Sequence, residues 1–436
     1  MIRSFLIVAL LLSQMVVAAE QPEFLKEAEK GDASAQWAMG NYNLVWQEYP
    51  EALKWLSKAA DQDLSLAYVS LALMYADGIG VEQNQAEATK WQNKMKPTQA
   101  ELHKPDFINR LSPDKSAATI AHIRETAEKG NVFCQYLIGV AYLRGNQYPR
   151  DQKEAIKWFS KAADAGLIVA MMYMANCYEQ GLGVPKDDAE AVKYYRRAAD
   201  KGYAFAELAL ALCYEEGRGI PKSMSDAFVW YKRSAETGNA IAQTKMAECY
   251  LLEEGVKKNE SEAVKWLVKA SDNNSSEAQL LLGSSYAKGE LGLPHDDKKA
   301  FDLYLKASEN GRTEVLYDVA EMHMKGAGTP SSFEKSLEWL KKAADARDER
   351  AFNALGMMYS EGVGVEKDLD QGFNWFAKGA ALDFPVCEYK VALCYLEGTG
   401  VTKDVKKGRA LLKKCADKGD KEAKEKLDQF PVDAGK

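Results

Sequence analysis

The chain contains few of the residues that build catalytic and metal sites. Only four of its 436 residues are histidine, and His103, His122, His295 and His323 are scattered along the sequence. No cysteine stands at metal-ligand spacing from another cysteine or from a histidine. The sequence also has no phosphate loop, nucleophile elbow or paired-carboxylate signature. It therefore predicts no catalytic residues, no metal site and no cofactor.

The chain also lacks a dominant charge of one sign. Lysine and arginine number 57 against 64 aspartates and glutamates, which gives a formal net charge of −7. Both signs are interspersed along the sequence, without the basic stripe that binds a phosphate backbone. We therefore expect no nucleic-acid partner.

Residues 1–19 read as a secretory signal peptide. Arg3 precedes an apolar run from Phe5 to Leu12, and small residues lead up to Ala19. An uncleaved anchor is the alternative, but the run is short for a membrane span of about 20 residues. The sequence predicts cleavage after Ala19, no membrane span in the mature chain, and a periplasmic or secreted protein.

A tyrosine that ends an apolar helical stripe recurs along the chain. The first five copies are 36 residues apart, the next step is 37, and the spacing of 36 then resumes. The series is Tyr142, Tyr178, Tyr214, Tyr250, Tyr286, His323, Tyr359 and Tyr395. Fixed periods of this length are typical of repeat proteins.

One copy, residues 167–202, shows what each unit contains. Ala170, Ala175 and Tyr178 lie on one face of a first helix, here helix A. Gly181 and Gly183 end it in a tight loop, and Asp187 can cap a second helix, helix B. Such hairpins cannot bury their apolar faces alone, so we expect them to stack into an all-α solenoid of about 36-residue helix-turn-helix repeats.

The pattern has a leading alanine, Gly or Ala five residues on, tyrosine eight residues on, a G-x-G loop and a helix that ends in K-A-A. It resembles the Sel-one-like repeat, a relative of the tetratricopeptide repeat. The resemblance implies a right-handed α/α superhelix that serves as an adaptor or scaffold, often in bacterial envelopes, and it implies no common catalytic residues.

The pattern divides the chain into segments. Residues 20–95 hold an N-terminal helix and two repeats, and residues 131–419 hold eight contiguous repeats. Between them, residues 96–130 contain Pro97, Pro105 and Pro113, which predict a distorted repeat that serves as a hinge or is merely irregular. Residues 420–436 predict a polar capping helix and tail.

The seven cysteines occupy slots for small apolar residues within this pattern. Copies one repeat apart should lie roughly 10 Å from each other, which exceeds disulfide reach. Cys387 and Cys415, at neighbouring ends of two antiparallel helices, form the one pair that we consider able to join.

A column of side chains two residues after each leading small residue is the candidate partner-binding surface. In tetratricopeptide-like arrays helix A lines the concave side, and residues at this position point into it. The candidates, with nearby polar residues of helix A, are Trp37, Tyr136, Met172, Asn176, Leu208, Glu248, Tyr317, Asn353 and Tyr389. Burial of the column between repeats is the competing interpretation.

The sequence thus predicts a non-enzymatic exported scaffold that binds another protein or peptide on its concave face. Tyr178 and its copies are expected to be buried packing residues, as is Trp230 in helix B. Two alternatives stay open. Relatives of the repeat family suggest a β-lactam-binding or β-lactam-hydrolysing envelope protein, and a structural spacer in an envelope complex would carry the same pattern.

Overall fold

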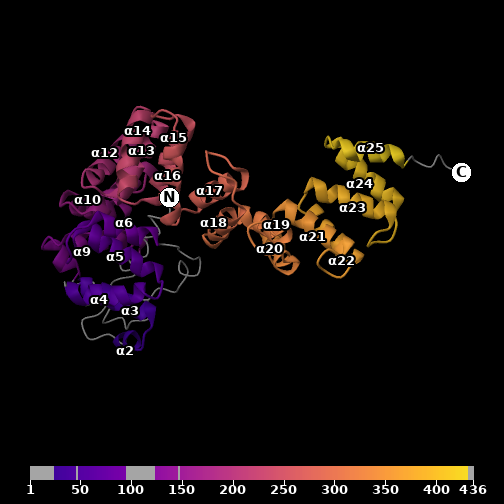
Figure 1. Cartoon of the computed structure of the whole chain (residues 1–436). Coiled ribbons are helices and arrows are strands. Elements are labelled where there is room, and N and C mark those ends of the chain that lie inside the picture. Colours follow the sequence, from indigo (N-terminus) through magenta and orange to yellow (C-terminus); the bar gives the residue numbers. More distant parts are fainter. Residues whose placement is uncertain (1–23, 46–47, 95–122, 146–147, 431–436) are drawn as a thin grey trace. The chain divides into compact units, whose positions relative to one another are not determined.

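The computed structural model describes residues 24–45, 48–94, 123–145 and 148–430, and every regular element in these residues is helical (Figure 1). The expected all-α architecture is confirmed there. The predicted signal peptide and the three prolines of the irregular segment lie outside the described residues. No helix of the described part is long and apolar enough to cross a membrane.

The helices alternate along the chain as the repeat pattern predicts. The A helices are α3 (Ala33–Val45), α5 (Ser65–Asp77), α9 (Val132–Arg144), α11 (Ile168–Gln180), α13 (Ala204–Glu216), α15 (Ala240–Leu252), α17 (Ser276–Lys288), α19 (Leu316–Lys325, preceded by the 3-10 turn η2, Thr313–Val315), α21 (Glu349–Glu361) and α23 (Pro385–Glu397). The B helices are α4 (Tyr49–Ala60), α6 (Gln85–Asn93), α10 (Gln152–Asp164), α12 (Asp188–Ala199), α14 (Met224–Glu236), α16 (Glu260–Asp272), α18 (Asp297–Glu309), α20 (Phe333–Asp345), α22 (Leu369–Ala380) and α24 (Val405–Asp417).

The turn between α11 and α12 shows how local chemistry ends one helix and starts the next. Gly181 takes a left-handed φ of 69° and its N–H donates to the Cys177 carbonyl. The Asp187 carboxylate then accepts from the N–H groups of Ala189 and Glu190, two donors that helix geometry leaves free. The predicted cap of helix B is therefore confirmed.

The second glycine of the G-x-G loop is required for a different reason. A Cβ on Gly219 would lie 2.1 Å from the carbonyl oxygen of Asp188, at the start of the preceding repeat's helix B. The loop between α15 and α16 has Glu253 at the first position, with φ 60°, but keeps Gly255 at the second. These glycines therefore allow close packing between successive repeats.

The chain divides into two compact units between Asn274 and Ser275. In the N-terminal unit, one hydrophobic cluster runs from Trp37 to Cys213 and joins both groups of repeats. In the C-terminal unit the core consists of smaller clusters, each shared by neighbouring repeats. The first unit therefore has the more continuous core.

Short helices stand at both ends of the described chain. Helix α2 (Phe24–Glu29) packs on α3, and α25 (Lys421–Gln429) packs on α24. Ala423 of α25 is fully buried, whereas most of the helix is charged and exposed. This is the polar capping helix expected at the C-terminal end of a solenoid.

Candidate functional site

The predicted inner column is enclosed in the N-terminal unit. Trp37, Tyr136, Met172 and Leu208 are 4%, 0%, 7% and 0% exposed, and Asn176 on the same side of α11 is 5% exposed. The prediction that these five residues face a partner is therefore wrong. They are core residues in the described structure.

Neighbouring A helices are what cover this part of the column. The Trp37 indole N–H of α3 donates to the Ser70 hydroxyl of α5, at 3.3 Å. The Tyr136 ring of α9 packs edge-on against Tyr173 of α11, with ring centroids 5.6 Å apart. Trp37 and Tyr136 are thus each covered by a residue three positions after the leading small residue of the next repeat, an arrangement that the periodicity alone does not reveal.

Helix α11 is buried on nearly all faces because a distant helix also contacts it. Helix α5 packs against α11, although their sequences lie about 90 residues apart. Asp77, the last residue of α5, accepts a hydrogen bond from the Ile168 N–H at 2.8 Å. The side chain that caps α11 therefore comes from the second repeat, since Leu167 at its own N-cap supplies none.

The same column is partly exposed in the C-terminal unit. We call this part the inner row and define it as Leu280 of α17, Tyr317 of α19, Asn353 of α21 and Tyr389 of α23. All four side chains are half-buried. The inner row therefore keeps the accessibility that the N-terminal part of the column has lost.

Glu248, the remaining predicted residue, lies on α15 at the end of the N-terminal unit. It is half-buried, and its carboxylate pairs with Lys245 of the same helix at 2.9 Å. Its environment is thus a local ion pair. The structure does not place it with the inner row, which belongs to the other unit.

An arginine fixes the environment of Tyr317. The Arg350 guanidinium of α21 lies over the Tyr317 ring, 4.4 Å from its centroid, and 3.5 Å from the Asp318 carboxylate. Its Nη2 also donates to Asp348 at 2.7 Å, and this hydrogen bond raises the pKa of Arg350. Burial raises the pKa of Asp318, although the nearby guanidinium opposes that shift. One face of Tyr317 is thus already covered by a cation.

Asn353 and Tyr389 have no such cation over them among the described residues. The Asn353 Oδ1 atom is enclosed, and no donor among the described residues reaches it. Tyr389 packs beside the small cluster of α23, α24 and α25, and partial burial is the main cause of its raised pKa. Met357 and Leu393, four residues after Asn353 and Tyr389, are also half-buried. Helices α21 and α23, which contact each other, thus each carry a half-buried apolar side chain one turn after their inner-row residue.

The periodic tyrosines differ from their prediction. Tyr178 and its copies are half-buried instead of enclosed, and only His323 at this position is fully buried. Tyr178 stacks on Tyr194 of helix B, with centroids 5.9 Å apart. Lys407 donates to the Tyr395 hydroxyl at 2.7 Å and lies over its ring. These tyrosine side chains thus contact helix B from helix A and remain partly exposed to solvent.

A buried polar column was missed by the sequence reasoning. It stands one residue after the leading small residue, where glutamine recurs as Gln36, Gln135, Gln243 and Gln279. Gln243 donates to the Ala235 carbonyl of the preceding helix B and accepts from Asn273 of its own, at 3.0 and 2.9 Å. At the equivalent position, Glu388 pairs with Lys414 and Lys418, each at 2.6 Å. The recurrence of glutamine at the repeat spacing is the sequence signal that could have revealed this buried polar column.

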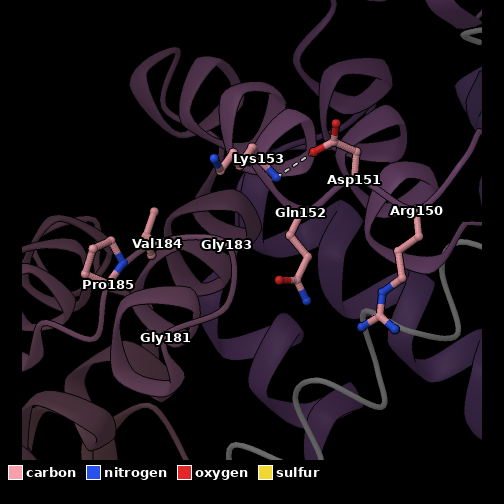
Figure 2. A pocket seen from close by; sticks show the side chains of 8 residues that line it. All are labelled: Arg150, Asp151, Gln152, Lys153, Gly181, Gly183, Val184 and Pro185. Carbon is pink, nitrogen blue, oxygen red and sulfur yellow. Dashed lines mark hydrogen bonds between the residues drawn. The ribbon is translucent and has the colours of Figure 1, made fainter.

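A hollow of about 610 Å³ lies between the loops of two successive repeats in the N-terminal unit. Figure 2 shows its lining, which consists of Arg150–Lys153 on one side and of Gly181 and Gly183–Pro185 on the other. The Asp151 carboxylate that borders it already accepts the Lys153 and Glu154 N–H groups as the cap of α10. That carboxylate is therefore already used as a helix cap.

The cysteines and histidines form no metal-binding group within the described residues. All seven cysteines are buried free thiols, so the Cys387–Cys415 bridge that we considered is absent from this structure. Burial raises the pKa of Cys177 to about 12, which removes its reactive thiolate form near neutral pH.

Comparison with known proteins identifies the repeat. The sequence model of the Sel1 repeat matches ten segments, at residues 33–64, 65–94, 132–167, 168–203, 204–239, 240–275, 276–311, 313–348, 351–384 and 385–420. The chain belongs to the Sel1 repeat family. The ten matches correspond to the two and eight repeats that the sequence pattern predicted.

Two solved Sel1 structures are similar over most of the chain. The first is a protective antigen of uropathogenic Escherichia coli strains that displays an SLR fold. It is 27% identical, with 94% of this chain and 81% of that chain covered and a TM-score of 0.59. The second is a Sel1 repeat protein from Oxalobacter formigenes, 26% identical, with 77% and 89% covered and a TM-score of 0.50. The Sel1 solenoid is a fold that typically mediates protein–protein interaction.

Proposed function

We propose that this Sel1 repeat protein is an exported, non-enzymatic scaffold that holds a protein or peptide partner on the inner row of its C-terminal unit. The observation that carries this proposal is the difference between the two units. The inner column is enclosed as far as Leu208, but Tyr317, Asn353 and Tyr389 are partly exposed. Solenoid proteins usually bind their partners on the extended concave surface of the stacked repeats, and this requires that the helix A surface stays accessible.

The absence of a sequence signature for catalysis supports the non-enzymatic part of the proposal. The N-terminal apolar run supports export, which places the mature chain in the periplasm or outside the cell. Fractionation of the source cell followed by intact-mass measurement tests this part. We expect a mature chain that begins at Glu20, and a full-length chain confined to the cytosol would contradict export.

Site-specific photocrosslinking tests the docking surface. A photoreactive amino acid would replace Tyr389 in one variant, and Val229 or Val268 in control variants. Both valines are exposed apolar residues of B helices, 54% and 41% accessible. We expect the Tyr389 variant alone to give one dominant adduct in its native compartment. Equal adducts at the valine positions, or none at Tyr389, would argue against the inner row.

A further inference from the structure

Helix α24 differs from the other B helices in the charges of its first turn. Every other described B helix has a glutamate or an aspartate there, whereas α24 has none and begins with Lys406 and Lys407. Acidic residues in the first turn complement the partial positive charge at the start of a helix, and lysines at the same place are unfavourable. The last repeat therefore departs from a local rule that the other described repeats follow.

This departure also removes an ion pair that recurs on the B helices. The third residue of the helix is a glutamate that pairs with the lysine three residues later in Glu51–Lys54, Glu87–Lys90, Glu154–Lys157, Glu190–Lys193 and Glu262–Lys265. At the equivalent positions α24 has Lys407 and Ala410. Between Asp404 and Asp417 the sequence contains five basic residues and no acidic residue.

Two of the five basic side chains are available to a partner. The other three have partners within the fold, which are Glu388 for Lys414, the Tyr395 hydroxyl for Lys407 and the Leu427 carbonyl for Arg409. Lys406 and Lys413 are exposed, and neither forms an ion pair with a carboxylate of the described residues. They stand at i and i+7, which places them on one face of the helix, about 10 Å apart along its axis.

The neighbouring elements leave this face basic. The sequence of α25 has three basic and three acidic residues, and α23 has Glu388, Lys390 and Glu397, of which Glu388 is already paired with two lysines. Asp404 is the cap of α24 and accepts the Lys407 N–H, and Asp417 is its last residue. The acidic residues of α24 and its cap thus stand at its two ends, in a protein whose net charge is −7.

We propose that the exposed face of α24 is a second docking surface, which binds an acidic segment of a polypeptide partner through Lys406 and Lys413. It goes beyond the proposed scaffold function, because the inner row belongs to A helices and α24 is a B helix. In an extended polyproline II segment, residues three apart lie on the same side at a distance of about 9 Å, close to the spacing of the two lysines. Anionic membranes and nucleic acids fit less well, because they attract larger clusters of cations, about four or more.

Fluorescence anisotropy with the full-length protein tests the proposal. The probe is a labelled short peptide with glutamate at every third position, and its control has glutamine at the same positions. We expect the glutamate peptide to bind at least about tenfold more tightly than the glutamine peptide, because the lysines attract only the charged form. Its affinity should fall about threefold or more from low to physiological salt, because exposed charges are screened.

Three variants locate the surface. Lys406→Glu should weaken peptide binding about tenfold and yet fold at least as stably as the natural protein, because glutamate is favoured in the first turn of a helix. Lys413→Glu should weaken binding to a similar degree. Lys341 of α20 is exposed and has the same place in its repeat as Lys413, so Lys341→Glu is the matched control and should change the affinity less than about twofold.

The contradicting results are distinct from these. Equal binding of the two peptides, or an equal loss of affinity in the Lys341→Glu variant, would overturn the docking surface on α24. Flotation with phosphatidylglycerol vesicles and a gel shift with double-stranded DNA are measured in parallel. If either of these binds through Lys406 while the glutamate peptide does not bind, the polypeptide partner is overturned.

Discussion

Single residues at one repeat position can have different surroundings. Leu208 and Tyr389 both stand two residues after the leading small residue of helix A, yet the first is fully buried and the second half-exposed. The difference comes from the neighbours that each repeat meets, since the local helix geometry is the same. The position of a residue in the repeat therefore determines which way its side chain points, and the packing between repeats determines how much of that side chain is exposed.

The aromatic slot of helix B gives a prediction at this scale. Trp230 was expected to be buried, but it is half-buried, and Arg233 lies over its ring at 4.4 Å. The adjacent Tyr231 is fully buried. We expect Tyr231→Ala to lower the free energy of unfolding by about 3–5 kcal/mol and Trp230→Ala by roughly half as much, since deletion cost follows burial.

Urea unfolding followed by circular dichroism measures both variants. The two positions are neighbours on α14, so each serves as the control for the other. A larger loss from Trp230→Ala than from Tyr231→Ala would contradict the burial that the structure gives them.

At the scale of elements, the G-x-G loop joins successive hairpins through backbone contact. A Cβ on Gly328 would lie 2.1 Å from the Asp297 carbonyl oxygen, whereas a Cβ on Gly311 would meet nothing within 4 Å. Both glycines have a positive φ, at 69° and 88°. Alanine substitutions at these two glycines therefore distinguish the free-energy cost of a left-handed backbone from the cost of a steric contact.

We expect Gly311→Ala to destabilise the protein by about 1 kcal/mol, the ordinary cost of a left-handed backbone for alanine. Gly328→Ala should cost at least twice as much, because the loop must also move away from α18. Chemical denaturation of the two variants checks this order. Equal losses would indicate that the loop accommodates a methyl group without strain.

The contact between α5 and α11 is also an element-scale feature, and it makes stability depend on pH. Burial raises the pKa of Asp77 from 3.8 to about 7, although the Ile168 N–H and Lys201 oppose the shift. The folded state therefore holds this proton more tightly than the unfolded chain. The stabilisation is complete below pH 3.8 and is lost as the pH rises through about 7.

Asp77→Asn removes this ionisation while it keeps an oxygen that can accept the Ile168 N–H. The stability of the variant relative to the natural protein should therefore increase from pH 5 to pH 8, by at most about 3 kcal/mol. Denaturant unfolding of both proteins at the two pH values gives the difference. If the difference in unfolding free energy between the two proteins is the same at pH 5 and at pH 8, the raised pKa of Asp77 is contradicted.

At the scale of the whole molecule, the two units differ in how their cores are built. The N-terminal unit encloses α11 within one continuous cluster, whereas the C-terminal unit has a separate small cluster for each group of neighbouring repeats. A continuous core supports long-range order, and separate clusters leave the A helices of each repeat partly accessible. We infer that the N-terminal unit has a mainly structural role and that the C-terminal unit binds the partner.

Hydrogen exchange provides a prediction for this division. Amides of residues 172–177, in the enclosed interior of α11, should exchange more slowly than those of α21 in the C-terminal unit, because opening α11 disrupts the larger core. Helix α25, which is mostly exposed, should exchange fastest of the three. Mass spectrometry of peptic fragments measures all three in one experiment. Exchange of α11 at the rate of α25 would contradict the enclosed core.

Most of the fold could be predicted from the sequence because its causes are local or periodic. Apolar spacing, Gly181 at a helix end and Asp187 at a helix start define the hairpin within one repeat. The period of about 36 residues then requires that hairpins stack, since one hairpin cannot bury its own apolar face. The small residues of the K-A-A motif are buried in the structure for the same reason.

The candidate site depended on contacts that no single repeat contains. Tyr136 and Tyr389 have the same place in the pattern, but Tyr136 meets Tyr173 and Phe159, and Tyr389 keeps an accessible side. The sequence by itself determined which side of helix A each residue occupies, because that follows from helical spacing. Only the tertiary structure decided which inner residues are covered, because the covering side chains come from other repeats, as Ser70 does for Trp37 and Tyr173 for Tyr136.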